Sequence, residues 1–216
     1  MPDQTYQKEP GALRADARHN RERILEAARE AYAAQGTDVP LTAIARRAGV
    51  GVATLYRRFP TRTALVAEAF AEQLSLCAGV LDEALADPDP WHGFCAVIEK
   101  VCVMQAVDRG FTAAFLAQFP DGGTDYERVW SRTEEGLAEL VRRAKAHGGL
   151  RADFAPSDLP LLLLANAGVA AEPREVAVAA SRRLAAYLLH ALRAEGARPL
   201  PPPAPLDLRS VHAERR

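Results

Sequence analysis

The sequence predicts an all-α protein, and three observations support this fold class. Leucine and alanine dominate the 216 residues, whereas runs of β-branched residues are few. Most of the chain divides into segments in which apolar positions recur at helical spacing. Proline and glycine separate these segments, and the pattern predicts about nine helices.

The N-terminal region contains a polar arm followed by the first helix. Residues 1–16 are polar and are interrupted by Pro10 and Gly11, so they are expected to form a flexible arm. Apolar residues at helical spacing then predict a helix over about 18–35. Gly36 supplies the C-terminal stop of this helix.

Two short helices follow, separated by a tight glycine turn. The first is expected to begin near Pro40, because proline suits the first turn of a helix, and to end at Gly49. The second is expected over about 51–57, carries arginines and is stopped by Pro60. Two short helices joined in this way, the second one basic, are typical of a helix-turn-helix DNA-binding motif, here about residues 41–60.

The remaining chain predicts one long helix and five further helices. Thr61 offers an N-cap for the long helix, which is expected over about 62–86 and is ended by Pro88. The five further helices are expected over about 91–107, 109–118, 125–147, 156–169 and 173–195. The proline-rich residues 197–216 are expected to form a disordered extended tail.

Charge is unevenly distributed along the chain. Residues 11–62 hold ten arginines and five acidic residues, whereas the whole chain has a net charge of −1. The N-terminal region is therefore basic and the rest of the chain is acidic. This asymmetry indicates a polyanionic partner for the N-terminal region alone.

Several classes of protein are disfavoured by the sequence. No apolar run approaches the roughly 20 residues that span a bilayer, and the N-terminus lacks the apolar segment of a signal peptide. Three sparse cysteines argue against a disulfide scaffold, so a cytoplasmic protein without a membrane partner is expected. The motifs of hydrolases, zinc proteases and redox enzymes are missing, and the five histidines share no ligand spacing. No enzyme activity, cofactor or metal is therefore expected.

Three motifs in the N-terminal region together resemble one family. They are Arg23-Ile24-Leu25-x-Ala27-Ala28, Ile44-Ala45-x-x-Ala48-Gly49-Val50 and Thr54-Leu55-Tyr56-x-x-Phe59-Pro60, followed by the basic Arg62. This pattern resembles that of the TetR family of transcriptional regulators. The resemblance implies a DNA-binding domain, placed here at residues 17–75, and a helical ligand-binding and dimerisation domain, placed at residues 76–196.

The chain departs from the family pattern at three positions. Pro40 lies where the family often has a Thr that touches phosphate, and Arg58 replaces a frequent His. Arg62 lies where Lys is commoner. Both arginines keep or increase the positive charge, so phosphate contact is still expected.

The second helix of the motif is expected to enter the major groove with its first residues against base edges. Val52 and Ala53 can only pack on a thymine methyl group, whereas Arg57 has the reach for guanine. Family counterparts indicate phosphate contacts for Thr54, Tyr56, Arg58 and Arg62, while Arg29 and Arg47 are expected to be solvated. The residues predicted to contact DNA are Thr42, Gly51, Val52, Ala53, Thr54, Tyr56, Arg57, Arg58 and Arg62. Those predicted to form the core of this domain are Tyr32, Ile44, Val50, Leu55 and Phe59.

The C-terminal domain is expected to carry a dimer surface and a ligand pocket. The last two predicted helices present apolar stripes, and their predicted dimer contacts are Leu161, Leu164, Leu184, Tyr187, Leu188 and Ala191. Aromatic and soft apolar side chains gather earlier in this domain. Those expected to line a pocket are Trp91, Phe94, Ile98, Cys102, Phe111, Phe115 and Trp130.

These expectations favour a homodimeric, sequence-specific DNA-binding regulator. The chain is interpreted as a repressor that binds a palindromic operator in double-stranded DNA and is released from it by a small-molecule effector. Two alternatives remain open. One is a redox-sensing regulator that uses Cys77, Cys95 or Cys102, and the other is a protein-interaction module whose N-terminal domain no longer binds DNA.

Overall fold

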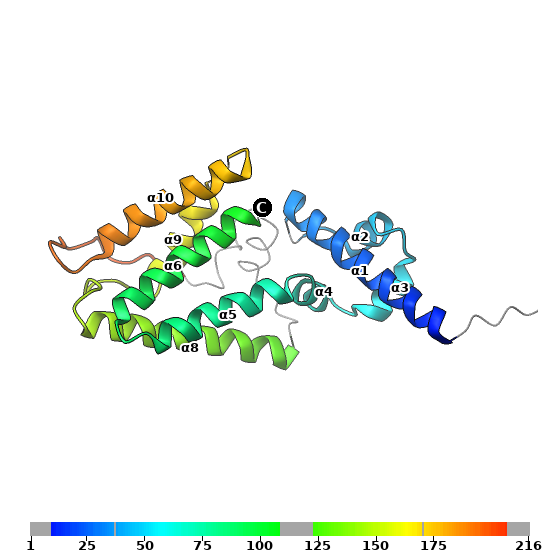
Figure 1. Cartoon of the computed structure of the whole chain (residues 1–216), viewed down its shortest axis with the longest axis horizontal. Coiled ribbons are helices and arrows are strands. Elements are labelled where there is room, and N and C mark those ends of the chain that lie inside the picture. Colours follow the sequence, from blue (N-terminus) through cyan, green and yellow to red (C-terminus); the bar gives the residue numbers. More distant parts are fainter. Residues whose placement is uncertain (1–9, 37, 109–122, 170, 207–216) are drawn as a thin grey trace, which may run out of the picture.

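The computed structural model describes residues 10–36, 38–108, 123–169 and 171–206 (Figure 1). Within these ranges the chain forms nine helices and no strand, apart from one isolated bridge between Leu150 and Arg193. The helices are α1 (Pro10–Gln35), α2 (Leu41–Arg47), α3 (Val52–Arg58), α4 (Arg62–Ala69), α5 (Ala71–Ala86), α6 (Pro90–Val107), α8 (Gly123–Ala146), α9 (Asp158–Ala167) and α10 (Arg174–Leu192). The predicted all-α class is confirmed.

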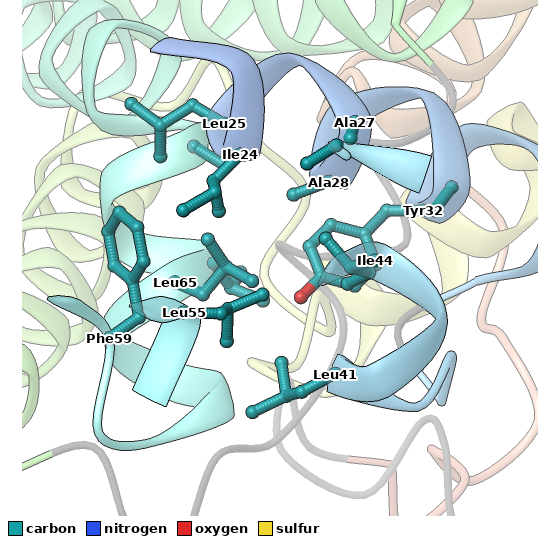
Figure 2. Packing of buried hydrophobic residues seen from close by; sticks show 14 of the residues in the cluster. Ile24, Leu25, Ala27, Ala28, Tyr32, Leu41, Ile44, Leu55, Phe59 and Leu65 are labelled. Atoms are coloured by element: carbon teal, nitrogen blue, oxygen red, sulfur yellow. The ribbon is translucent and has the colours of Figure 1, made fainter. Parts of the chain in front are cut away.

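Buried apolar side chains divide the molecule into two parts. Helices α1 to α4, here called the head, share one cluster that includes Ile24, Tyr32 and Leu55 (Figure 2). Helices α5 to α10, here called the body, share a second cluster that includes Phe94 and Leu140. In the body, α6 packs against α5, α8, α9 and α10 and so lies at the centre of the bundle (Figure 1).

The first helix begins earlier than the sequence predicts. Helix α1 starts at Pro10, so the expectation of a flexible arm is wrong for residues 10–16. Proline lacks the N–H that the first turn of a helix leaves unbonded, so Pro10 is well suited to start one. The alanine, leucine and arginine that follow favour its continuation. The rest of the expected arm lies outside the described residues.

The long helix predicted over 62–86 is broken. Phe70, with φ −118° and ψ 20°, separates α4 from α5, and the two helices meet at a bend of 65°. Phe70 is buried in the head, where its ring lies 6.2 Å from that of Tyr32. Val66 and Phe70 pack in the head core, whereas Leu81 packs in the body core. The bend lets one segment of chain supply side chains to both cores.

The start of the C-terminal tail is bonded to the body. The Leu200 N–H donates to Asp153 Oδ2 at 3.0 Å, and the Arg151 guanidinium donates to the carbonyl of Arg198. The expectation of a disordered tail over 197–216 is therefore wrong for residues 198–200. The proline-rich segment forms no helix or strand here, but two hydrogen bonds to residues 47 positions earlier in the chain fix it.

Four of the remaining predicted helices correspond to α6, α8, α9 and α10, whose observed ends lie within a few residues of the predicted ones. The helix predicted over 109–118 lies outside the described residues. No single described helix has both the length and the apolar composition of a membrane span, and only the bent pair α4 and α5, taken together, reaches them.

Candidate nucleic-acid interface

The turn between α2 and α3 is closed by backbone hydrogen bonds and a left-handed glycine. The Gly49 N–H donates to the carbonyl of Arg46 at 3.1 Å, and the Val50 N–H donates to that of Ala45 at 3.0 Å. Gly49 has φ +63°, a conformation that side chains disfavour and glycine adopts without strain. The turn therefore fixes the direction in which α3 leaves α2.

Helix α3 has one buried and one exposed face. Leu55 on α3 and Phe59 directly after it are buried in the head core, as predicted. Val52 and Tyr56 lie on the opposite face and are 41% and 46% exposed. Other residues of the predicted DNA contact set are also exposed, namely Thr42, Gly51, Ala53, Arg57 and Arg58. Thr54 is half-buried.

The other predicted core residues of the head lie where the sequence placed them. Tyr32 and Ile44 are buried (Figure 2). Val50 is half-buried and packs against the same cluster. Burial raises the pKa of Tyr32 to about 12, although the positive charge of Arg62 opposes this shift. The Tyr32 hydroxyl has no hydrogen-bond partner among the described residues.

The arginines of the head fall into two groups. Arg57 and Arg58 on α3 form no ion pair with any described acidic residue, so their charges face solvent. Arg47 on α2, in contrast, has its Nε 2.9 Å from Glu30 Oε2 on α1. The exposed face of α3 therefore offers basic charge to a polyanion.

Arg62 is partly engaged within the head. Its Nη1 lies 3.3 Å from Asp38 Oδ1, and its Nη2 lies 3.4 Å from the Asp38 carbonyl oxygen. Thr61 caps α4 by accepting a hydrogen bond from Ala64 N at 3.1 Å, as the sequence predicts. Arg62 thus joins the start of α4 to the loop before α2. Arg62 and Asp38 are 24 residues apart in the sequence, so no local pattern indicates this pair.

Arg29 has a structural role that sequence reasoning missed. It was expected to be solvated, but its Nη1 donates to the carbonyl of Ala69 at 3.2 Å. Its Nη2 also lies 2.7 Å from Glu26 Oε2, which orients the guanidinium. Arg21 forms a second tie by pairing with Glu68. These contacts fasten α4 to α1, and no local pattern in the sequence indicates them.

The predicted pocket residues of the body are only partly described. Trp91, Phe94, Ile98 and Cys102 are buried in the body core, where the Trp91 and Phe94 rings stack with centroids 5.8 Å apart. Phe111 and Phe115 lie outside the described residues, and Trp130 lies on α8 with its side chain outside the description. Their role in ligand binding stays a prediction.

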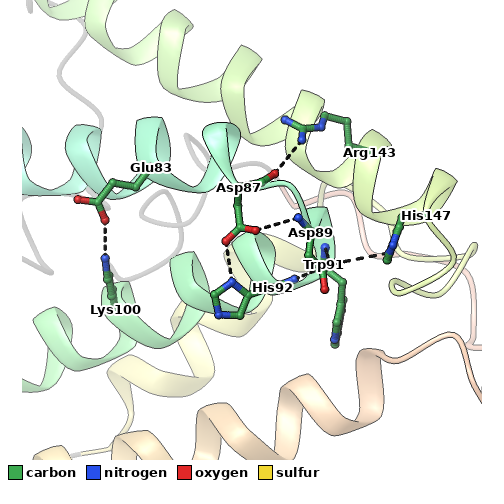
Figure 3. Close-up of polar contacts among 8 residues, drawn as sticks. All are labelled: Glu83, Asp87, Asp89, Trp91, His92, Lys100, Arg143 and His147. Atoms are coloured by element: carbon green, nitrogen blue, oxygen red, sulfur yellow. Dashed lines mark hydrogen bonds and ion pairs between the residues drawn. The ribbon is translucent and has the colours of Figure 1, made fainter.

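A groove lies on the body between α5 and α6, with one lining residue from α10. Its volume is about 760 Å³, and none of the four described pocket residues lines it. Its lining residues are Ser75, Leu76, Gly79, Val80, Glu83, Glu99, Lys100, Val103, Met104 and Arg182. Lys100 Nζ lies 2.7 Å from Glu83 Oε2 across the two helices (Figure 3). The lining of this groove is mainly apolar, and its charged groups are of both signs.

Polar contacts order the turn that joins α5 to α6 (Figure 3). Asp89 caps α6 by accepting hydrogen bonds from Trp91 N at 2.9 Å and His92 N at 3.1 Å. Asp87 Oδ2 lies 2.6 Å from His92 Nδ1, and this contact lowers the pKa of Asp87 and raises that of His92. Although Asp87, Asp89, His92 and His147 lie near one another, the described residues contain no group of His, Cys, Asp and Glu suited to a metal ion.

Helices α9 and α10 present an apolar surface. Leu161 and Tyr187 are 51% and 59% exposed, and Ala191 is exposed as well. Three more residues of the predicted dimer set are half-buried on the same helices, namely Leu164, Leu184 and Leu188. Large exposed apolar side chains on two helices that pack against each other suit contact with a protein partner.

The three cysteines are poorly suited to redox sensing. Cys102 is buried, and Cys77 and Cys95 are half-buried. Burial raises the pKa of each thiol to about 11. The reactive species in thiol oxidation is the thiolate, so these thiols react slowly at neutral pH.

Comparison with known proteins identifies both parts of the chain. Residues 24–69 match the model of bacterial regulatory proteins of the tetR family, and residues 89–194 match the C-terminal domain of SbtR-like transcriptional regulators. Comparison with curated proteins finds no match.

Comparison with solved structures finds chains that are similar over most of their length. A TetR transcription regulatory protein from Mycobacterium vanbaalenii is 30% identical, over 84% of this chain and 99% of that one, with a TM-score of 0.44. PfmR, a TetR-family regulator from Thermus thermophilus, is 20% identical over 80% and 97% of the two chains, with a TM-score of 0.57. NalD from Pseudomonas aeruginosa, the secondary repressor of the MexAB-OprM multidrug efflux pump, is 19% identical over 84% and 99%, with a TM-score of 0.57. The chain therefore belongs to the TetR family of transcriptional regulators, which bind DNA and are not enzymes.

Proposed function

We propose that this regulator is a homodimeric repressor that binds a palindromic operator and is released by a small molecule. The observation that carries the proposal is the exposed face of α3, where two arginines lie without an acidic partner among the described residues. A helix of this kind, set by a glycine turn, fits the major groove of duplex DNA.

Within α3, the division between base reading and phosphate contact follows from side-chain reach. Arg57 can form two hydrogen bonds with guanine, which discriminate against a wrong base by about 1–3 kcal/mol. Arg58 and Tyr56 are exposed on the same helix and are proposed to bind phosphates, which position the protein without reading sequence. Val52 and Ala53 at its start are proposed to pack on thymine methyl groups.

Dimerisation through α9 and α10 is the second part of the proposal. One head offers a small basic surface, and two heads spaced by about one turn of DNA, roughly 34 Å, would read both halves of a palindrome. Leu161 and Tyr187 are exposed on these helices, and burying such side chains against a second copy would form a four-helix bundle.

The effector is proposed to bind in the body. A cavity of several hundred Å³ that is mainly apolar with a few polar groups is typical of small-molecule sites, and the groove between α5 and α6 has this character. An effector acts only through different affinities for the DNA-bound and free forms, typically by about 1–3 kcal/mol. The redox alternative is disfavoured because burial raises the pKa of all three thiols.

Selection of bound sequences from random duplex DNA tests the DNA-binding part. The wild-type protein should enrich a palindrome, and Arg57→Ala should relax the preference at one base pair of each half-site. Arg62→Ala should instead weaken binding about equally on all sequences and reduce the salt dependence. Arg132→Ala, in an exposed ion pair on α8, is the control and should change neither property.

A half-site preference that Arg57→Ala leaves unchanged would contradict the base-reading assignment. If no sequence is enriched at any salt concentration, the interaction-module alternative replaces the proposal. If none of the compounds that bind the protein changes its affinity for DNA, the effector part of the proposal fails while the DNA-binding part stands.

A further inference from the structure

The head and the body meet at a small apolar contact, not along a continuous helix. Because the chain bends by 65° at Phe70, the direction of α5 does not by itself set that of α4. Helix α4 is fastened to α1 by Arg29, which bonds the carbonyl of Ala69, and by the pair of Arg21 with Glu68. Mechanically, α4 is therefore part of the head.

Body side chains reach the head core from two helices. Leu74 and Cys77 on α5, together with Met104 on α6, are half-buried and pack against the head cluster. Cys77 Sγ lies 3.9 Å from Met104 Sδ, so the two helices meet at this contact. The last turns of α6 consequently touch the head directly.

The same turns of α6 are bonded to α9 and α10 by buried polar side chains. Asn166 Nδ2 on α9 donates to the Cys102 carbonyl and to Gln105 Oε1, both at 2.9 Å. The Ser181 hydroxyl on α10 lies 2.7 Å from Asn166 Oδ1 and 2.9 Å from the Cys102 carbonyl oxygen. Its single hydrogen can donate to only one of them at a time. We call Gln105, Asn166 and Ser181 the polar cluster.

The hydrogen bonds of the polar cluster depend on orientation, whereas apolar packing does so much less. Gln105, Asn166 and Ser181 are 4%, 2% and 0% exposed, so water does not compete for their bonds. Hydrogen bonds require defined distances and angles, whereas apolar side chains tolerate sliding and repacking. Because Gln105 directly follows Met104, the bonds that fix α6 against α9 and α10 also fix the residue that touches the head.

We infer that Asn166 is a positioning residue that, through the polar cluster and Met104, sets the orientation of the head relative to α9 and α10. In a dimer built on α9 and α10, this orientation determines the half-site spacing that the two heads accept. The consequence for operator spacing depends on the proposed function, but the orientation itself does not.

The experiment compares the wild-type protein with the double variant Asn166→Leu, Ser181→Ala. This variant removes the polar atoms of Asn166 and Ser181, and Gln105 Oε1 loses the donor of Asn166. Spin labels carried by non-canonical residues at exposed Ala33 on α1 and Ala186 on α10 report the distance from head to body. Labelled chains are diluted with unlabelled ones, so that only distances within one chain are measured.

The wild type should give one narrow distance distribution, and the double variant should give a broader or shifted one. The preference for the selected operator over operators lengthened by one or two base pairs should also fall by about five-fold or more. Val97→Ala is the control, because Val97 is a buried residue of α6 that belongs to the body core but not to the polar cluster.

A distribution that stays as narrow in the double variant as in the wild type would overturn the inference. Equal broadening in Val97→Ala would do the same, because the effect would then follow from lost packing in general. If the double variant is not helical, Ser181→Cys, which keeps the shape with a weaker donor, replaces it. Failure of the wild type to bind any DNA refutes the proposed function, and the label distances still test the orientation.

Discussion

Arg151 offers a sharp test of what holds the end of α10. Its side chain is only 6% exposed. Nε lies 2.6 Å from Asp153 Oδ1, and Nη2 lies 3.0 Å from Oδ2 of the same carboxylate. Nη1 donates to the carbonyl of Ala191 at 3.1 Å, and the guanidinium also bonds the carbonyl of Arg198. One cation thus closes the C-terminus of α10 and anchors the tail.

Arg151→Met keeps an apolar stem and removes all of these bonds. Loss of a buried, hydrogen-bonded ion-pair partner lowers the free energy of unfolding by about 3–5 kcal/mol. Because the Asp153 carboxylate that is left behind is half-exposed and can be hydrated, the low end of this range, about 3 kcal/mol, is expected. For a chain of this size the loss corresponds to a fall of about 6–12 °C in Tm. Thermal unfolding followed by circular dichroism, at one fixed protein concentration, measures it.

Arg142→Met is the matched control. Arg142 pairs with Glu139 on the surface of α8 with the same type of contact, but its side chain is 68% exposed. Exposed pairs contribute little, so its Tm should stay within the error of the wild-type value. If the two variants lower Tm equally, burial of Arg151 does not confer the stability assigned to it.

Three further predictions concern the head and the turn before α6. Asp38→Asn should raise affinity for DNA of any sequence by a few-fold in a fluorescence titration, since Arg62 loses a competing carboxylate; unchanged or weaker binding would contradict this. Tyr32→Phe should unfold at equal or higher urea concentration, with a gain up to about 1 kcal/mol, because it removes a buried hydroxyl without a described partner. The contact of His92 with Asp87 raises the pKa of His92, so its stabilisation is present below the usual histidine range and is lost as pH rises through the raised value. Tm should therefore fall slightly from pH 6 to pH 8, and His92→Gln should abolish this slope.

The local patterns of the head could be predicted because they depend on neighbours in sequence. The apolar residues of α1 recur at helical spacing, and Ile24 and Tyr32 are buried as that spacing requires. Gly49 marks the turn because only a residue tolerant of positive φ fits there. The exposed face of α3 followed from placing Leu55 in the core.

The features that escaped prediction depend on distant parts of the chain. The sequence around Phe70 is compatible with a continuous helix, and only the presence of two cores makes a bend favourable. Arg29 and Ala69 are separated by 40 residues, and Asn166 and Cys102 by 64. Such contacts carry no local signal, so a single sequence cannot distinguish these side chains from solvated or isolated ones.

The bend at Phe70 also defines a natural joint for protein engineering. Because Phe70 completes the head core and Ala71 begins the first helix of the body, a recombinant exchange of heads between related regulators should be joined between these two residues. A joint placed earlier, within α4, would assemble the head core from two different proteins and separate Arg21 from Glu68, its side-chain partner. The surface to be matched in such a chimera is the small one formed by Leu74, Cys77 and Met104.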